Sequence, residues 1–296
     1  MRKRKMRYIC AMLFMICCIS DMRVNAQEDK IYYVRQDGTG DFTSIQDGVN
    51  QVEDGAVLII TPGVYNESVT VTDKTIRRIG TNREKCIIMA SAENYHNIPL
   101  TIGAGMVSNL TIYGRNLSGE YIQSVSLNEN TVYEWQDTFP GYAIHIDQDY
   151  SYGRELIIDN CKVISDSNQC IGIGSRGKST IQISNSELIA NGQGCIYLHN
   201  NSNPELDGDA QFIMKNCRLT NYKCPYIMAL HSMGKSNSLY LTFENVKAST
   251  VAYEDMTCYN TWNANTWFDV RALQSYAVKQ YLQENTSLSK TTNHHL

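Results

Sequence analysis

Hydrophobic and polar residues follow a pattern that repeats four times between residues 142 and 246. Each repeat opens with a short strand in which every second residue is apolar, crosses a polar loop, and closes with a second strand that carries an asparagine. The opening strands are 142–147, 170–174, 195–199 and 227–231. The closing residues are Asn160, Asn185, Asn216 and Asn245, with spacings of 25, 31 and 29 residues. A repeat of this length is typical of a solenoid.

The alternation within the opening strands assigns their two faces, because successive side chains of a strand point to opposite sides. The apolar face carries Ile144, Ile146, Ile171, Ile173, Ile196, Leu198, Met228 and Leu230. A unit of this size cannot bury such a face alone, so consecutive units are expected to stack as coils of a parallel β-helix. Asparagine suits the shared corner because it tolerates left-handed backbone angles and can hydrogen-bond to its stacked neighbour. The alternative is a β-sandwich of short strands, which gives no reason for one ordered motif in every repeat.

The N-terminal part follows the same plan less regularly. An amphipathic helix is expected at 41–52, where it would cover the open end of the solenoid. Turn-forming residues at Pro62-Gly63, Asp73 and Gly80 separate the predicted strands. These strands span residues 56–60, 68–71, 76–79, 86–89 and 106–112.

Three further segments depart from the repeat. Residues 115–140 are polar and off-period, which indicates an insertion on the loop side of the solenoid. Residues 269–283 carry apolar side chains at helical spacing, so a second, C-terminal helix is expected there. Residues 285–296 are expected to form a flexible tail.

The first 26 residues have the composition of a signal peptide. A basic start is followed by a short apolar run at 8–19 and by Val24-Asn25-Ala26, which favours cleavage before Gln27. The apolar run is too short to span a bilayer, which disfavours the alternative of an N-terminal membrane anchor. We therefore expect a secreted protein, located in the periplasm, outside the cell or on its surface, with one β-helix domain over 27–284.

Removal of this leader changes the charge of the chain. It takes six of the 26 basic residues and one of the 30 acidic residues, which leaves 20 and 29 and a formal net charge of −9. Such a surface repels nucleic acid and anionic lipid, so neither is expected as a partner. A polyuronate would also be repelled unless a cation or a local basic patch intervened.

Seven cysteines remain after leader cleavage. They are Cys86, Cys161, Cys170, Cys195, Cys217, Cys224 and Cys258. Their spacing contains no CxxC pair and no zinc-ligand motif, so no metal site is expected, and the sequence identifies no cofactor. The odd count leaves at least one free thiol in an exported protein, and the repeat favours cysteines that serve as small buried apolar residues.

Part of the N-terminal region resembles a known family. The run from Val34 to Val49 (VRQDGTGDFTSIQDGV), then 62–67 (PGVYNE) and Ile79-Gly80, is similar to the opening of pectinesterases and related pectin-lyase-fold proteins. The match covers residues 31–89. The resemblance implies an all-β, single-stranded right-handed parallel β-helix, and it implies polysaccharide as the partner, pectin-like or another acidic glycan.

The resemblance does not extend to the residues that carry pectinesterase chemistry. The family uses one Asp as nucleophile, a second as acid and base, glutamines near the oxyanion, and an Arg with a Trp that hold the sugar. Here Tyr142 stands where the family has its first Gln, Gln169-Cys170-Ile171 replaces Gln-Asp-Thr, and Cys195-Ile196 replaces Asp before an aromatic residue. Gln136-Asp137-Thr138 spells the family tripeptide, but it falls in the polar insertion and is read as chance. Without the two acids, ester hydrolysis by this route lacks its nucleophile and its proton donor.

The outward residues of the repeat are expected to form two columns. The first column is His145, Gly172, Tyr197 and Ala229, and the second is Asp147, Gly174, His199 and His231. Neighbouring coils lie roughly 4.8 Å apart, so His199 and His231 would be direct neighbours. The two glycines would leave an open floor between the larger side chains.

These columns supply the candidate site. We expect His145, Asp147, His199 and His231 to be the catalytic candidates, because imidazoles and a carboxylate can perform acid–base chemistry. Tyr142 and Tyr197 could hold a sugar ring, and Arg154 and Arg176 on nearby loops could hold a uronate carboxylate. The simpler interpretation is that outward positions of a strand are polar for solubility alone.

Three functions remain open at this point. The protein could be a carbohydrate-active hydrolase, lyase or esterase, including a divergent pectinesterase. It could be a glycan-binding protein that kept the scaffold and lost the acids. It could also be a structural module of a surface. We favour a secreted, carbohydrate-active role for a monomer, with catalysis left undecided.

Overall fold

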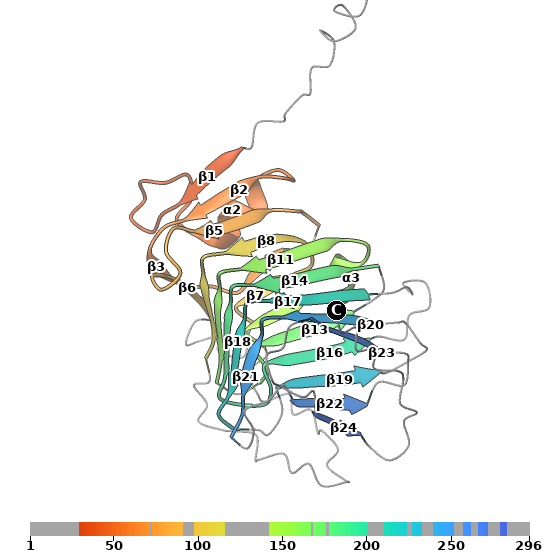
Figure 1. Cartoon of the computed structure of the whole chain (residues 1–296). Helices are drawn as coiled ribbons and strands as arrows, with labels where there is room; N and C mark the ends of the chain where they lie inside the picture. The colour runs from red at the N-terminus through yellow and green to blue at the C-terminus, as the bar shows by residue number, and fades with distance from the viewer. Residues whose placement is uncertain are drawn as a thin grey trace, which may run out of the picture. The chain divides into compact units, whose positions relative to one another are not determined.

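Three parallel sheets wind around one core in the computed structural model (Figure 1). The model describes residues 30–282 except for 72, 91–97, 116–141, 167, 176–177, 201–209, 224–226, 233–238, 252–256, 262–265 and 272–278. The predicted signal peptide, polar insertion and tail therefore lie outside the described residues, or almost entirely so.

Each complete coil contributes one strand to each sheet in the same order, and neighbouring strands of a sheet pair in parallel. Sheet A contains β1 (Ile31–Val34), β2 (Val57–Ile60), β5 (Arg77–Gly80), β8 (Gly105–Ser108), β11 (Glu155–Asp159), β14 (Thr180–Ser184), β17 (Ala210–Lys215), β20 (Leu239–Glu244) and β23 (Thr266–Arg271). Sheet B contains β3 (Gly63–Asn66), β6 (Cys86–Met89), β9 (Thr111–Gly114), β12 (Lys162–Ser165), β15 (Glu187–Ala190), β18 (Arg218–Asn221) and β21 (Lys247–Ser249). Sheet C contains β4 (Val69–Val71), β7 (Leu100–Ile102), β10 (Ile144–Ile146), β13 (Ile171–Ser175), β16 (Ile196–Asn200), β19 (Met228–Ser232), β22 (Thr257–Thr261) and β24 (Lys279–Leu282). The predicted right-handed parallel β-helix is confirmed.

An asparagine forms the corner between sheet A and sheet B in five consecutive coils. These residues are Asn109, Asn160, Asn185, Asn216 and Asn245, with φ between 48° and 55°. Left-handed backbone angles strain most residues, and asparagine is among the few side chains that adopt them readily. The amides also bond from coil to coil: Asn245 donates to Asn216 over 2.8 Å, and Asn160 donates to Asn109 over 2.6 Å. The predicted stacking of asparagines at a common bend is confirmed.

Asn109 also corrects the predicted strand over residues 106–112. The structure has two strands there, β8 and β9, which belong to different sheets because the chain turns at Asn109. The apolar residues on both sides of the corner are all suited to strands, so periodicity alone gave no break. A strand at Gly63–Asn66 was also missed, because Pro62-Gly63 was read as a turn.

The predicted N-terminal cap is present as helix α2 (Ile45–Gln51), which packs Ile45 and Val49 into the core at the end of the solenoid. Glu67 fixes its start, because its carboxylate accepts hydrogen bonds from the backbone N–H groups of Ile45 and Gln46 at 3.0 and 2.9 Å. Unpaired N–H groups at a helix start favour such an acceptor. The glutamate of the family-like PGVYNE segment therefore has a structural role.

The C-terminal helix expected at 269–283 is wrong where the structure describes this segment. Residues 269–271 belong to β23 and residues 279–282 to β24, which continue sheets A and C. The physical reason is the open sheet edge. The strands of the preceding coil present unpaired backbone groups that a further strand satisfies and a helix does not.

The interior is filled by the inward face of every strand. The strand residues predicted to face inward are buried wherever the structure describes their side chains, and so are five of the seven cysteines, all as free thiols. Burial raises the pKa of Cys161 to about 12 and that of Cys217 to about 11, so both remain neutral thiols. This agrees with the prediction that the cysteines act as small apolar residues.

Arg78 is the one charged side chain among the described buried residues. Its side chain is fully buried, and it donates to the carbonyl oxygens of Met106 at 3.1 Å and Ala104 at 3.4 Å. Its Nε and Nη1 atoms have no hydrogen-bond partner in the described part of the chain. Desolvation lowers the pKa of this guanidinium, which shows that burial disfavours its charge.

Replacement of Asn216 tests the left-handed corner. We expect Asn216→Ala to lower the free energy of unfolding by about 1–2 kcal/mol, because alanine is strained at positive φ. Asn216→Gly removes the same amide without the strain, so it should cost less. Urea denaturation followed by far-UV circular dichroism measures both. Equal losses for the two variants would show that the amide ladder, and not the backbone angle, determines the effect.

Replacement of Arg78 tests the buried charge. Arg78→Met keeps much of the volume and removes the desolvated guanidinium, so we expect unchanged or increased stability in urea denaturation. Arg78→Ala leaves a cavity and should lose about 2–4 kcal/mol. A loss of that size for Arg78→Met would contradict this account and indicate a partner for the guanidinium.

Candidate functional site

The first predicted column exists on the outer face of sheet C. His145 of β10 pairs in register with Gly172 of β13, Gly172 with Tyr197 of β16, and Tyr197 with Ala229 of β19. The alternation that directs the neighbouring isoleucines inward directs this column outward. His145 and Tyr197 are partly exposed, whereas Gly172 and Ala229 are buried.

The expected open floor at Gly172 is not open. The ring of Tyr142 lies directly on Gly172, so closely that a methyl group at this position would overlap the ring carbons. Tyr142 comes from the segment that leads into β10, and it is 5% exposed. Glycine is therefore required here for close approach, and tyrosine fills the space that it leaves. The sequence suggested this glycine as an opening because the repeat does not show that the ring of Tyr142, at the start of one opening strand, lies over the strand of the next coil.

Tyr142, His145 and Tyr197 form a row of rings along sheet C, which we call the ring row. The centroids of Tyr142 and His145 are 5.7 Å apart with an interplanar angle of 19°. Those of Tyr142 and Tyr197 are 6.3 Å apart at 25°. The three rings are therefore stacked in nearly the same orientation, with the most buried ring in the middle.

The ring row is electrically neutral near pH 7. Burial raises the pKa of Tyr142 well above its ordinary value, and it raises the pKa of Tyr197 as well. Burial lowers the pKa of His145, and the negative charge of Asp147 opposes this effect in part. A neutral imidazole can accept a proton, and protonated phenols can donate hydrogen bonds. The row thus combines aromatic rings and polar edges and carries no charge, and its partly exposed members are His145 and Tyr197.

Asp147 is placed differently from the prediction. Strand β10 ends at Ile146, and Asp147 caps helix α3 (Gln148–Ser151), where its carboxylate accepts a hydrogen bond from the N–H of Asp149 at 2.8 Å. It acts on His145 through charge. The structure therefore associates Asp147 with His145 of its own coil.

The second column is present as backbone register. Gly174 pairs with His199, and His199 pairs with His231 in the adjacent strand. The two histidine side chains lie outside the part of the structure that is described. Arg154 is exposed in the turn before β11, and Arg176 lies outside the described residues. Of the eight predicted site residues, the structure brings together Tyr142, His145 and Tyr197, with Asp147 beside them.

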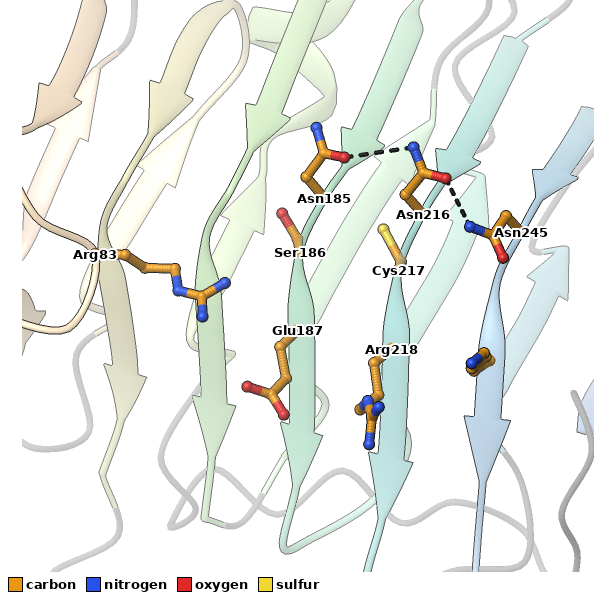
Figure 2. Close-up of a pocket in the computed structure, with 9 residues that line it drawn as sticks. Arg83, Asn185, Ser186, Glu187, Asn216, Cys217, Arg218 and Asn245 are labelled. Carbon is orange, nitrogen blue, oxygen red and sulfur yellow. Dashed lines mark hydrogen bonds between the residues drawn. The ribbon is translucent and has the colours of Figure 1, made fainter.

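The structure also has a hollow that the sequence did not predict. It is a groove of about 350 Å³ on the outside of sheet B next to the asparagine corner (Figure 2). Its lining includes Asn185, Asn216 and Asn245 together with Arg218 and Lys247. A signal existed, because a charged residue stands two positions after each of the corner asparagines from Asn160 onward. We call this hollow the corner groove.

Other kinds of site find no support in the described part of the chain. Among these residues, no three histidine, cysteine or carboxylate side chains are grouped in a way that could hold a metal ion. None of the described helices has the length and apolar character needed to cross a membrane.

Comparisons with known proteins relate the chain to one group of solved structures. It is similar to a pectin methylesterase from carrot at 12% identity, with a TM-score of 0.44 over 88% of each chain. It is similar to pectin methylesterase PemA from Erwinia chrysanthemi at 13% identity, with a TM-score of 0.44 over 86% of this chain and 92% of the other. For a pectin methylesterase from Aspergillus niger the values are 11%, 0.37 and 93% of both chains. No family model and no curated protein matches the chain. At these identities the likeness concerns the fold.

The titration of His145 tests the environment of the ring row. We expect its pKa, measured by NMR on the imidazole, to lie below 6.5, and Asp147→Asn to lower it further because the carboxylate favours the imidazolium. Asp149→Asn, two residues further along and within helix α3, is the matched control and should have a smaller effect.

The same shift predicts how stability depends on pH. Since folding lowers the pKa of His145, its contribution is fully present above about pH 6.5 and is lost as the pH falls through the pKa of the folded protein. In urea denaturation between pH 7 and 5, His145→Gln should therefore lose less stability than the wild type. An identical pH dependence would show that His145 titrates as in the unfolded chain.

Proposed function

We propose that this protein is an exported β-helix protein that binds polysaccharide along the outer face of sheet C. The observation that carries the proposal is the ring row, in which Tyr142, His145 and Tyr197 are stacked along consecutive coils. The proposal includes cleavage before Gln27 and a monomeric protein, as expected from the sequence.

The ring row has the chemistry that a sugar requires. Tyrosine and histidine combine a flat apolar ring with a polar edge, which matches the apolar faces and hydroxyl groups of a pyranose. Aromatic side chains lose little conformational entropy on binding, and here strand pairing and the contact with Gly172 already hold them in place.

The direction of the row favours a polymer as the ligand. The three rings follow one another across β10, β13 and β16, so the row runs along the axis of the solenoid. Solenoids present long side faces of this kind to extended partners. The expected mature protein has a net charge of −9, so most of its surface would repel an acidic polysaccharide. The ring row carries no charge and adds nothing to this repulsion.

We propose binding without ester hydrolysis by the pectinesterase route. The resemblance places the two catalytic acids of that family at Cys170 and Cys195, and both residues are buried cysteines. Burial raises the pKa of Cys170 well above its ordinary value, so it remains a neutral thiol. A buried neutral thiol is a poor nucleophile and cannot replace a carboxylate as acid and base.

A second candidate function is acid–base catalysis on a glycan by His145. It is favoured by one observation, which is that a neutral imidazole stands on the ring row within the electrostatic influence of Asp147. In this case Asp147 would stabilise the imidazolium that forms during turnover.

Tyr197→Ala tests the proposed binding face. We expect the affinity for a polysaccharide that the wild type binds to fall about tenfold or more, because the variant lacks a partly exposed aromatic ring of the binding face. The measurement is isothermal titration calorimetry on the mature protein against neutral and acidic polysaccharides found to bind the wild type. Tyr222→Ala is the matched control, because Tyr222 is 61% exposed and lies beyond sheet B. Equal affinity of the wild type and Tyr197→Ala would overturn the proposal.

Turnover separates the two candidate functions. Catalysis would be established by two results together. The wild type releases products from the bound polysaccharide, and His145→Gln lowers the rate of release about tenfold or more while its affinity stays the same. Binding without products is the result expected from the main proposal.

A further inference from the structure

The corner groove lies on a different sheet from the ring row and has the opposite electrostatic character. It is lined by three cations, Arg83, Arg218 and Lys247, and by one carboxylate, Glu187. This excess of positive charge stands on a chain whose expected mature form carries a net charge of −9. The groove is therefore a local basic patch on an acidic protein.

One wall of the groove is a ladder of amides (Figure 2). The Nδ2 of Asn245 donates to Asn216, that of Asn216 donates to Asn185 over 3.4 Å, and that of Asn185 donates to Asp159 over 2.7 Å. An amide nitrogen carries two hydrogen atoms, and each of these bonds uses one. Three exposed N–H donors thus remain, one per coil, beside the cations.

The floor of the groove is formed by the last three members of a column of charged residues on sheet B, from Glu187 to Lys247. Lys162, Glu187, Arg218 and Lys247 pair in register, one from each of four consecutive strands. Neighbouring strands lie about 4.8 Å apart, so Arg218 and Lys247 are direct neighbours of like charge. Like charges in direct register destabilise a sheet. No structural benefit within the sheet explains this pair.

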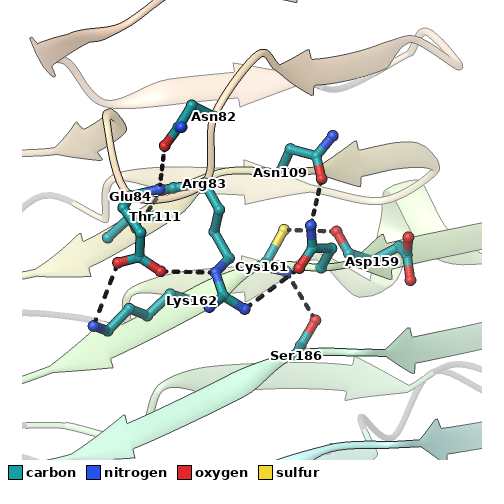
Figure 3. Close-up of polar contacts among 10 residues, drawn as sticks. Asn82, Arg83, Glu84, Asn109, Thr111, Asp159, Cys161, Lys162 and Ser186 are labelled. Carbon is teal, nitrogen blue, oxygen red and sulfur yellow. Dashed lines mark hydrogen bonds and ion pairs between the residues drawn. The ribbon is translucent and has the colours of Figure 1, made fainter.

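The cations at the two ends of the column differ in their partners, and Figure 3 shows the N-terminal end. At the N-terminal end, Glu84 lies 2.9 Å from the Nε of Arg83 and 3.6 Å from the Nζ of Lys162. Arg83 also donates to the Oδ1 of Asn160 at 3.3 Å. At the other end, the side chains of Arg218 and Lys247 make no hydrogen bond or ion pair with any described residue.

We propose that the corner groove binds the carboxylate or sulfate group of an acidic saccharide. Arg218 and Lys247 supply the charge, and the free amide hydrogens of Asn216 and Asn245 supply directed donors to the anionic oxygens. Anion binding follows from these residues alone, whereas the choice of a saccharide rests on the proposed function. The site offers a second contact for a glycan held elsewhere on the protein.

The charge pattern favours a saccharide over a nucleic acid. Glu187 interrupts the column between Lys162 and Arg218, which leaves two adjacent unpaired cations and not a continuous basic track. Nucleic-acid binding depends on many phosphate contacts along such a track. A ligand with one anionic group for each sugar unit requires fewer contacts.

The double variant Arg218→Gln/Lys247→Gln tests the site in the full mature protein. Calorimetry is performed with oligogalacturonate, a heparin oligosaccharide, a neutral dextran, sodium sulfate and a single-stranded DNA oligomer. We expect at least an about tenfold loss of affinity for the two acidic saccharides and no change for dextran. Lys223→Gln is the matched control, because Lys223 is an exposed lysine in the turn after β18, and it should stay within twofold of the wild type.

Glu187→Gln provides a variant whose effect a structural role would not produce. Removal of the one carboxylate among the described lining residues should strengthen binding of the acidic saccharides about two- to fivefold, and the gain should disappear in high salt. Far-UV circular dichroism confirms that each variant is folded.

Several results would overturn the proposal. Unchanged affinity of the double variant excludes the groove as a site. If sodium sulfate binds as tightly as the saccharides, the groove is a site for a free anion. If the DNA oligomer binds more tightly than the saccharides, and the variants weaken its binding equally, the groove is a nucleic-acid site. The ring row is tested separately: if Tyr197→Ala binds normally while the double variant does not, the proposal for sheet C fails and this one stands.

Discussion

The structure depends on a left-handed asparagine at one corner of every central coil. At this corner the chain leaves sheet A and enters sheet B, with φ near 50° in five successive coils. Most side chains resist this angle, so asparagine fixes where each coil bends. Hydrogen bonds between the stacked amides then hold the bends at the same height in neighbouring coils. Loops of unequal length can be tolerated because the corners, and not the loops, determine the register.

Once the register is fixed, equivalent side chains line up along the solenoid whatever their chemistry. Inward positions form the aliphatic core, with buried cysteines among them. Outward positions form columns, and two of these acquire a distinct character. On sheet C a glycine admits a tyrosine ring between a histidine and a second tyrosine. On sheet B the same stacking places Arg218 next to Lys247 and beside the amide ladder.

The two surfaces complement each other physically. The ring row is neutral because burial raises the pKa values of its tyrosines and lowers that of its histidine, so the sugar contacts that we propose for it do not depend on charge. The corner groove is exposed and positively charged, so it depends on the charge of its ligand and on the salt concentration. A protein with both could discriminate between glycans by shape at one face and by charge at the other. The core that supports them also contains Arg78, a buried cation whose burial is unfavourable and which belongs to neither surface.

The sequence by itself determined the architecture. Alternating apolar residues and regularly spaced asparagines report local preferences, and in a solenoid each coil contacts mainly its neighbours, so local pattern and global fold coincide. It also predicted the register of His145, Gly172 and Tyr197, and the helix at 41–52. It did not reveal that Asn109 is a corner, that residues 269–271 and 279–282 are strands, or that Glu67 caps a helix, because these depend on which sheet edge or helix end lies nearby. Only the tertiary structure decided that Tyr142 covers Gly172, and that Arg218 and Lys247 stand side by side with no ion-pair partner among the described residues. The reason is that contacts between coils bring together residues whose separation in sequence carries no information about their distance in space.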